Sequence, residues 1–251
     1  MLGTLRAFCG FGSLRVMLER ECASLVVILI GLLAYIAGTL LLGPDLTQEN
    51  KSILVLASDK YEQSNGGVDM AYMVRLENGS LKNYTPVYPG EMYHPSKSAP
   101  GGLSGHMMLH DCLWDGVEQG MENAAEIVEY HTGMHADAVV LVYDEGVDNV
   151  IDSVRPLVVD GKETNLSATD IIRENDAYNG YAGNENVPGT MSRADAVMVL
   201  VKALANAAKD PEKKSTMVQA AIKEYSNGNI VMKPDGAFTR LLATKGFESI
   251  A

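Results

Sequence analysis

Two pairs of histidines with the same spacing are the first residues in this chain that could do chemistry. His106 and His110 stand four apart in HMMLHDCLW, and His131 and His135 repeat the spacing in EYHTGMH. On a helix, residues four apart lie on one face, as do the two histidines of a zinc-binding HExxH helix. The spacing therefore suggests a metallohydrolase as one function class.

The surroundings of both pairs argue against a zinc site. The HExxH pattern needs an acidic residue directly after its first histidine, and this chain has Met107 there. A catalytic zinc needs three protein ligands, and neither pair comes with a third. Gly133 is expected to end the second helix, which would separate the second pair. We therefore expect no zinc in this protein, and no stoichiometric transition metal at His106 and His110.

The elements that must position any site begin with a membrane segment. Residues 24–43, SLVVILIGLLAYIAGTLLLG, carry no charge and are almost wholly apolar. Twenty helical residues span about 30 Å, the thickness of a bilayer hydrocarbon core. A cleaved signal peptide or a buried core helix is the alternative, but a signal peptide would have a shorter apolar region ending in a small-residue cleavage site. We expect residues 24–43 to be an uncleaved transmembrane signal anchor.

The orientation of that anchor follows from the charges around it. Three arginines precede the apolar run, and positive charge is retained on the cytoplasmic side of a membrane. Residues 1–23 should therefore be a cytoplasmic tail. Residues 44–51 should be a linker, and residues 52–251 a single extracytoplasmic domain.

Charge and cysteine usage narrow the function classes further. The chain has 20 basic and 32 acidic residues, a net charge of −12 at pH 7. Such a surface repels nucleic acid, so we expect no nucleic-acid partner. Cys112 would be the only extracytoplasmic cysteine, which excludes an internal disulfide. Four N-x-S/T sequons are compatible with a glycosylated surface protein, and they begin at Asn50, Asn78, Asn83 and Asn165.

The order of elements predicts an α/β fold. Continuous apolar runs at 52–57 and 136–143 are typical of strands buried on both faces, and Asn78-Gly79 between two strand-like runs indicates a hairpin. Helices are expected at 106–115, 116–133, 145–154, 191–209 and 211–228, and a long loop at 89–102. A strand and turn are expected at 156–163, a further helix start at Ser167, and an N-cap at Asp210. Strand–helix alternation favours a three-layer α/β/α sandwich with a mixed central sheet.

Several segments in order resemble a known family. SILVLASD, SNGGVDMAYMVRLENGSLK, AAEIVEYHTGMHADAVVLV and VDNVIDSVRPLVVDGK, over roughly residues 52–232, are similar to an uncharacterised envelope domain of unknown function related to the LytR–CpsA–Psr (LCP) proteins. The matching positions are Ser58 and Asp59, then Gly66, Gly67 and Asp69, then Thr132, Gly133 and Asp137, and finally Arg193.

The resemblance implies a domain that cradles a polyprenyl-pyrophosphate lipid. LCP enzymes use acidic residues with Mg²⁺, and several arginines, to transfer a glycopolymer from that lipid to the cell wall. Here the resemblance implies Asp59 and Asp69 as Mg²⁺ ligands, with Lys60, Arg75 and Arg193 as the cationic groups of the pocket. Strict strand alternation would also put Asp69 and Arg75 on the same face.

The chain departs from the family pattern at two arginines. Tyr88-Pro89-Gly90-Glu91 has glycine where the family has the arginine of Pro-Arg-Asp, and Arg193-Ala-Asp-Ala196-Val197 lacks the second arginine of Arg-x-x-Arg-Gln. We therefore expect the domain to bind a polyprenyl-(pyro)phosphate-linked glycan with weak or no transferase activity. An active LCP-type transferase and a purely scaffolding envelope protein are the alternatives.

Overall fold

The computed structural model describes residues 45–46, 48–87, 91–176, 191–237 and 240, without the side chains of Arg193 and Ala194. The predicted anchor at 24–43 lies outside these residues. In the described part, no helix combines the length and apolarity needed to cross a bilayer. The chain from Pro44 to Ala251 forms one compact unit.

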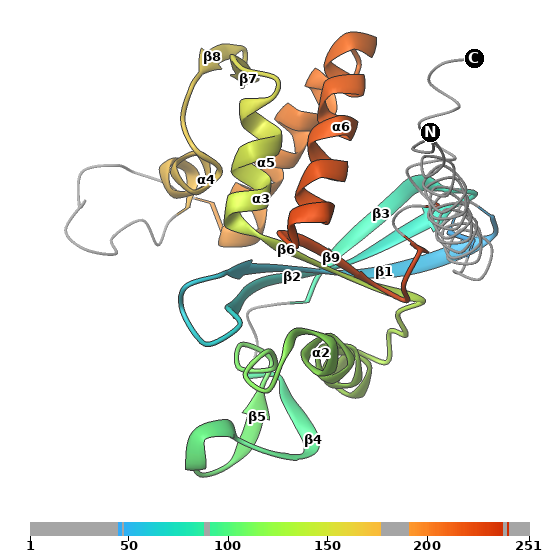
Figure 1. Ribbon diagram of the computed structural model, residues 1–251, viewed down its shortest axis with the longest axis vertical. Coiled ribbons are helices and arrows are strands. Elements are labelled where there is room, and N and C mark those ends of the chain that lie inside the picture. Colours follow the sequence, from blue (N-terminus) through green and yellow to red (C-terminus); the bar gives the residue numbers. More distant parts are fainter. Residues whose placement is uncertain (1–44, 47, 88–90, 177–190, 238–239, 241–251) are drawn as a thin grey trace, which may run out of the picture. The chain divides into compact units, whose positions relative to one another are not determined.

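A five-stranded sheet in the order β3-β2-β1-β6-β9 runs through this unit (Figure 1). Its central strand β1 is parallel to β6 and antiparallel to β2, and the β2–β3 and β6–β9 pairs are also antiparallel. The prediction of a mixed central sheet is therefore confirmed. The strands are β1 (Asn50–Asp59), β2 (Gly67–Glu77), β3 (Ser80–Pro86), β6 (Ala138–Tyr143) and β9 (Ile230–Lys233).

The two strands predicted from continuous apolar runs, β1 and β6, lie next to each other in the interior of the sheet. Leu54, Leu56 and Leu141 are fully buried, as expected for strands that have a neighbour on each side and side chains packed on each face. The predicted hairpin joins β2 to β3 through Asn78 and Gly79, which both have positive φ. Two central residues with positive φ give a turn whose twist matches that of the flanking strands.

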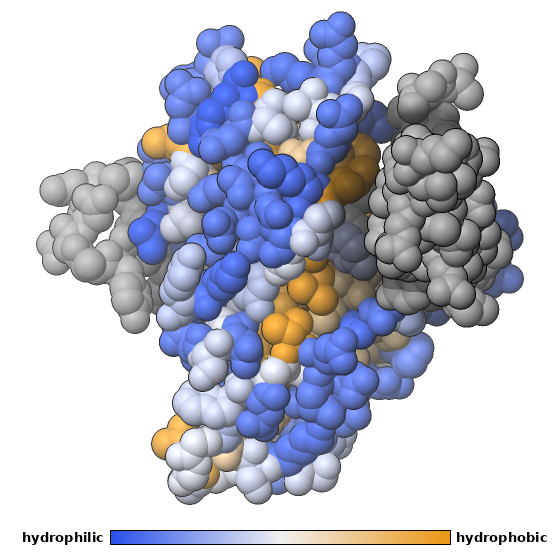
Figure 2. All heavy atoms as spheres, in the orientation of Figure 1, coloured by the Kyte–Doolittle hydropathy of each residue, from blue (hydrophilic) through white to orange (hydrophobic). Residues whose placement is uncertain are grey.

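Helices cover both faces of the sheet. Figure 1 shows α2 on one face and α3, α4, α5 and α6 on the other. One hydrophobic cluster joins β1, β2 and β6 to α2, and a second on the opposite face includes Ile53, Leu76 and Met232. The helices are α2 (Val117–Thr132), α3 (Asp144–Asp152), α4 (Ala168–Asn175), α5 (Arg193–Ala207) and α6 (Pro211–Asn227). The face seen in Figure 2 is mostly hydrophilic, in keeping with the acidic composition.

Helix ends were the most predictable local features. The Ser167 and Asp210 side chains accept hydrogen bonds from backbone N–H groups in the first turns of α4 and α6, because a capping oxygen satisfies donors that have no partner in the helix. Gly133 ends α2 with φ 68°. The strand and turn expected after α3 are β7 (Leu157–Val159) and β8 (Lys162–Thr164).

The helix expected at 106–115 is wrong, and so is the loop expected at 89–102. A strand, β5 (His106–Met108), pairs with β4 (Tyr93–Ser98), and a short 3-10 helix, η1 (Pro100–Gly102), lies between them. Met107 and Leu109 are buried while Met108 is partly exposed. This alternation has the period of a strand and outweighs the four-residue spacing of the histidines. Turns follow β5 as far as the start of α2.

Candidate functional site

A tight loop follows the carboxyl end of β1. Asp59, the last residue of β1, accepts a hydrogen bond through Oδ1 from the Tyr61 N–H at 2.8 Å, which is the geometry of an Asx turn. Gly66 closes the loop with φ +96°, and a Cβ at this position would lie 2.4 Å from the Ser58 hydroxyl oxygen. Only glycine fits this turn without displacing Ser58.

A β-bulge next to this loop sets the direction of Asp69. Ala57 pairs with Met70 but Ser58 pairs with Val68, so Asp69 is the extra residue on β2. A bulge breaks the strand alternation and re-aims the side chain it contains. In addition, the Val68 N–H donates to the His110 carbonyl oxygen at 3.0 Å, which ties the start of β2 to the turn after β5.

Asp69 meets two residues from separate segments at this bulge. One ligand atom each from Glu62, Asp69 and His110 lies within 4.8 Å of the other two, and this is the one such group among the described residues. The His110 Nε2 atom is 3.4 Å from Glu62 Oε2. Gly67 makes room for them, since a Cβ there would lie 2.7 Å from Glu62 Oε2 and 2.8 Å from His110 Nε2.

The other ring nitrogen of His110 is held in place. Its Nδ1 atom lies 2.8 Å from Asp111 Oδ1 and 3.1 Å from Gln63 Nε2, and Gln63 also donates to Asp111 at 2.9 Å. Burial lowers the pKa of His110, but the Asp111 hydrogen bond and the charge of Glu62 outweigh it and leave the pKa raised. A carboxylate on one imidazole nitrogen, with the other nitrogen facing outward, is the usual arrangement around a metal-binding histidine.

The three donors suit a divalent cation that accepts both nitrogen and oxygen. Mg²⁺, implied by the family resemblance, takes oxygen ligands in octahedral geometry, whereas imidazole suits Zn²⁺ and carboxylates suit Mn²⁺ as well. The mixed set of Glu62, Asp69 and His110 therefore fits Mn²⁺ or Zn²⁺ better than Mg²⁺. No third ligand stands near either histidine pair in the sequence, but folding brings the carboxylates of Glu62 and Asp69 next to His110. Glu62 itself carries no sequence signal.

Lys60 lies at the same end of β1 and is fixed by the neighbouring elements. Its Nζ donates to Asn229 Oδ1 at 2.8 Å, lies 3.6 Å from Glu145 Oε2, and stands 5.6 Å from the centre of the Tyr143 ring. Asp59 pairs with Gly67 in the β1–β2 ladder. Asp59, Lys60 and Asp69 are thus gathered at one edge of the sheet.

The other two predicted site residues are not part of this group. Arg75 pairs with Ser52 at the start of β1, six residues along β2 from Asp69. At about 3.3 Å per residue this is roughly 20 Å away, so sharing a strand does not place the two in one site. Arg193 is the first residue of α5, and its side chain lies outside the described part.

The remaining histidines have partners of other kinds. His94 is buried and its Nε2 lies 2.7 Å from Glu126 Oε2. His131 Nε2 lies 3.0 Å from the backbone nitrogen of Tyr93, and His135 pairs with Glu129 at the surface. His106 is exposed on β5. Because no helix joins His106 to His110, that pair does not share a helix face.

Fold and site together define a mixed α/β domain with an acidic and histidine-containing edge at the carboxyl end of its first strand. Residues 48–178 match a family described as "Protein of unknown function (DUF4012)". The chain belongs to this family. The expectation that the chain belongs to a family of unknown function is confirmed.

Solved structures share the fold at low sequence identity. The protein gbs0355 from Streptococcus agalactiae has a TM-score of 0.51 and 14% identity over 78% of this chain and 75% of that one. TagV of B. subtilis gives 0.48 and 16%, with 80% of each chain covered. A structure described as TagT bound to LI-WTA gives 0.40 and 16%, over 79% and 77%. The likeness to gbs0355 concerns the fold alone. No curated protein matches the chain.

Proposed function

We propose that this chain is a membrane-anchored, extracytoplasmic LCP-like protein of cell-envelope assembly that binds a polyprenyl-(pyro)phosphate-linked glycan. In this proposal residues 24–43 cross the cell membrane, with the N-terminus in the cytoplasm and the domain outside. The observation that carries the binding function is the convergence of Glu62, Asp69 and His110 at the end of β1.

The chemistry of the ligand explains why this group matters. A pyrophosphate is strongly negative, so an acidic domain needs a cation to bind it. Glu62, Asp69 and His110 would hold a divalent cation, and its open coordination positions would accept phosphate oxygens. Lys60 would add a second positive charge at the same edge, where Asn229 and Glu145 restrain its side chain.

The two missing arginines favour binding over efficient transfer. Position 90 is glycine and position 196 is alanine, and Ala196 is fully buried, so this position of α5 faces the core and offers no charge to a ligand. Charge that develops on a leaving pyrophosphate would then be less stabilised. An active LCP-type transferase and a purely scaffolding protein are the alternatives.

The test measures binding of a polyprenyl pyrophosphate, such as geranylgeranyl pyrophosphate, to the full-length chain in detergent. With Mn²⁺ or Mg²⁺ present, we expect saturable binding that EDTA abolishes. Asp69→Asn should weaken binding roughly ten- to hundredfold, the cost of about one or two charge-assisted contacts. His135→Ala is the matched control, because this exposed histidine pairs only with Glu129 in the described part.

Two outcomes would contradict the proposal. Binding that is equal in Asp69→Asn and His135→Ala would leave the domain without the proposed site. Rapid glycan transfer by the unmodified chain would instead favour the transferase alternative.

A further inference from the structure

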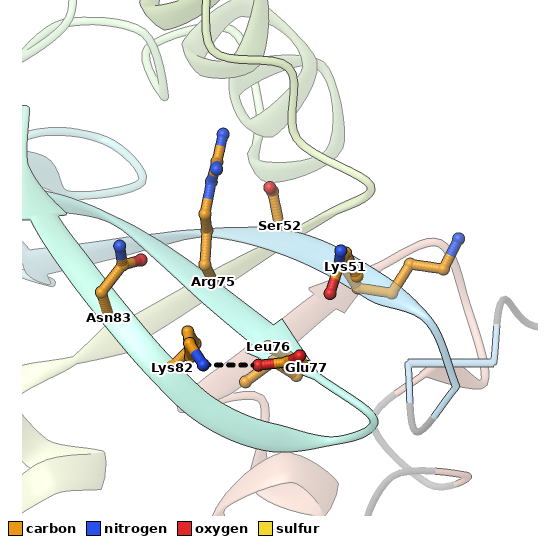
Figure 3. Close-up of a pocket in the computed structure, with 8 residues that line it drawn as sticks. Lys51, Ser52, Arg75, Leu76, Glu77, Lys82 and Asn83 are labelled. Carbon is orange, nitrogen blue, oxygen red and sulfur yellow. Dashed lines mark ion pairs between the residues drawn. The ribbon is translucent and has the colours of Figure 1, made fainter.

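A pocket lined mainly by polar and charged residues lies at the opposite end of β1 from Asp59. Its volume is about 520 Å³, and three strands line it with Asn50, Lys51, Ser52, Arg75, Leu76, Glu77, Lys82 and Asn83 (Figure 3). A pocket of this size can take a small organic ligand. Leu76 is the one apolar residue of the lining, so the other seven side chains offer polar or charged ends to a ligand.

The strand register places three hydrogen-bond donors side by side in this pocket. Ser52 pairs with Arg75, and Arg75 pairs with Asn83. Paired residues of neighbouring strands point to the same face of a sheet, with the strands about 4.8 Å apart. Figure 3 shows Ser52 and Arg75 pointing to the same side. A hydroxyl, a guanidinium and an amide therefore form one row.

A β-bulge adds a fourth polar group. The β2–β3 register shifts between Arg75 and Leu76, which makes Lys82 the extra residue on β3. Lys82 Nζ lies 2.8 Å from Glu77 Oε2. This hydrogen bond, with the charge of Lys82, lowers the pKa of Glu77.

The charge of the lining is opposite to that of the chain. Three cations face a single carboxylate here, while the chain as a whole carries −12. Lys82 is paired with Glu77, and Lys51 lies 3.5 Å from Asp137 Oδ1. The Arg75 side chain makes no ion pair or hydrogen bond with any residue that the structure describes.

We propose that this pocket binds a phosphorylated sugar, with the phosphate on Arg75. The guanidinium fork matches two phosphate oxygens, a geometry that a lysine ammonium does not offer. Ser52 and Asn83 donate to the same group from either side, and the remaining volume holds the sugar ring. This site is separate from the cluster around Asp69. A negative result at one of the two sites therefore does not contradict the proposal for the other.

The test titrates hexose 1-phosphate into the full-length chain in detergent and follows binding by calorimetry, with inorganic phosphate and the unphosphorylated hexose as comparison ligands. We expect saturable binding of the sugar phosphate, weaker binding of phosphate and none of the hexose. Arg75→Ala should lower the affinity roughly ten- to hundredfold. Arg75→Lys should recover part of it, since it keeps the charge and loses the fork.

Two further variants make the test independent of any loss of folding. Glu77→Gln removes the opposing carboxylate and releases Lys82, so it should raise the affinity. Arg173→Ala changes an exposed arginine on α4 and should leave the affinity unchanged. The proposal is overturned if no ligand binds at millimolar concentration, if Arg75→Ala behaves like Arg173→Ala, or if Glu77→Gln lowers the affinity.

Discussion

The imidazole of His110 and the carboxylate of Asp111 are neighbours in sequence and are joined by a contact of 2.8 Å between Nδ1 and Oδ1. This contact fixes the ring so that Nε2 points toward Glu62, 3.4 Å away. Asp111 therefore does not belong to the group that would touch a cation. It determines which nitrogen is available and holds that nitrogen in position.

Asp111→Asn should weaken metal binding without removing a ligand. Loss of such a supporting carboxylate typically costs about ten- to a hundredfold in metal affinity, and we expect that range for Mn²⁺ and Zn²⁺, with both binding more tightly than Mg²⁺. Titration calorimetry, with elemental analysis of the dialysed protein, measures the effect. Asp115→Asn, in the same turn but outside the cluster, is the control. Equal affinity in the two variants would contradict the role of Asp111.

Gly67→Ala should also impair metal binding, for a steric reason. The added methyl group would lie within 3 Å of Glu62 Oε2 and His110 Nε2, so both side chains must move from the cluster. Because those atoms are side-chain ends, the fold should survive. We expect near-native circular dichroism with at least a roughly tenfold loss of Mn²⁺ affinity, in line with disrupted ligand geometry. Native affinity would show that the cluster is looser than described.

The sheet could be predicted from sequence because its signals are local. The apolar run of β1 and the Asn78-Gly79 turn each act within a few residues, and so do the Ser167 and Asp210 caps. The prediction of a helix at 106–115 is wrong because apolar residues at 107, 109, 112 and 113 are compatible with the period of a helix and with that of a strand. Pairing with β4 decides the outcome, and the sequence of the segment alone does not contain it.

The site was only partly predictable for the same reason. Asp69 was identified through the family resemblance, but its partners Glu62 and His110 come from two other loops. The β1–β2 bulge, which has no recognisable sequence signature, brings the three together. Strand alternation predicts the face of a side chain and not its position along the strand, so it puts Asp69 and Arg75 on one face without placing them in one site.

The Cys112 thiol should be unreactive in the folded protein. Burial, with a contribution from the charge of Asp111, raises its pKa from 9.0 to about 12, and the residue is fully buried. In a chain with Cys9→Ser and Cys22→Ser, iodoacetamide at pH 8 should label Cys112 only as the protein unfolds. Labelling in guanidinium is the control, and rapid labelling of the native chain would contradict the burial.

The raised pKa of Cys112 also predicts that the folded protein loses stability at alkaline pH. Because the folded pKa lies above the unfolded one, this group's contribution to stability is complete below about pH 9 and is lost as the pH rises from 9 toward 12. A Cys112→Ala variant should lack that loss. Denaturation midpoints at pH 8 and pH 10.5 in both chains provide the measurement.

A buried polar network should make Asn229 important for stability. Its Nδ2 donates to Glu224 Oε2 at 2.7 Å, its N–H donates to the Glu224 carbonyl at 2.9 Å, and its Oδ1 accepts from Lys60. Both Asn229 and Glu224 are buried. Asn229→Ala removes one buried donor from the Glu224 carboxylate and the amide acceptor from Lys60, and it should cost about 1–3 kcal/mol. Asn227→Ala, which removes a longer 3.3 Å bond to the same carboxylate, should cost less in urea unfolding.

The topology of the chain is the last prediction. Residues 24–43 are uncharged and follow three arginines, which favours an anchor with its N-terminus in the cytoplasm. A protease added to intact cells or spheroplasts should therefore digest the domain after Pro44 and leave the N-terminal tail protected.

A cysteine-labelling experiment tests the same topology independently. A membrane-impermeant maleimide should react with a Ser226→Cys variant, exposed near the end of α6, and not with Cys9. Replacing Arg6, Arg15 and Arg20 with glutamate should weaken or invert this pattern, because the charge bias that orients the anchor is then reversed. If the chain that keeps its three arginines is labelled at Cys9 and not at position 226, the domain lies in the cytoplasm. That result would contradict the envelope function.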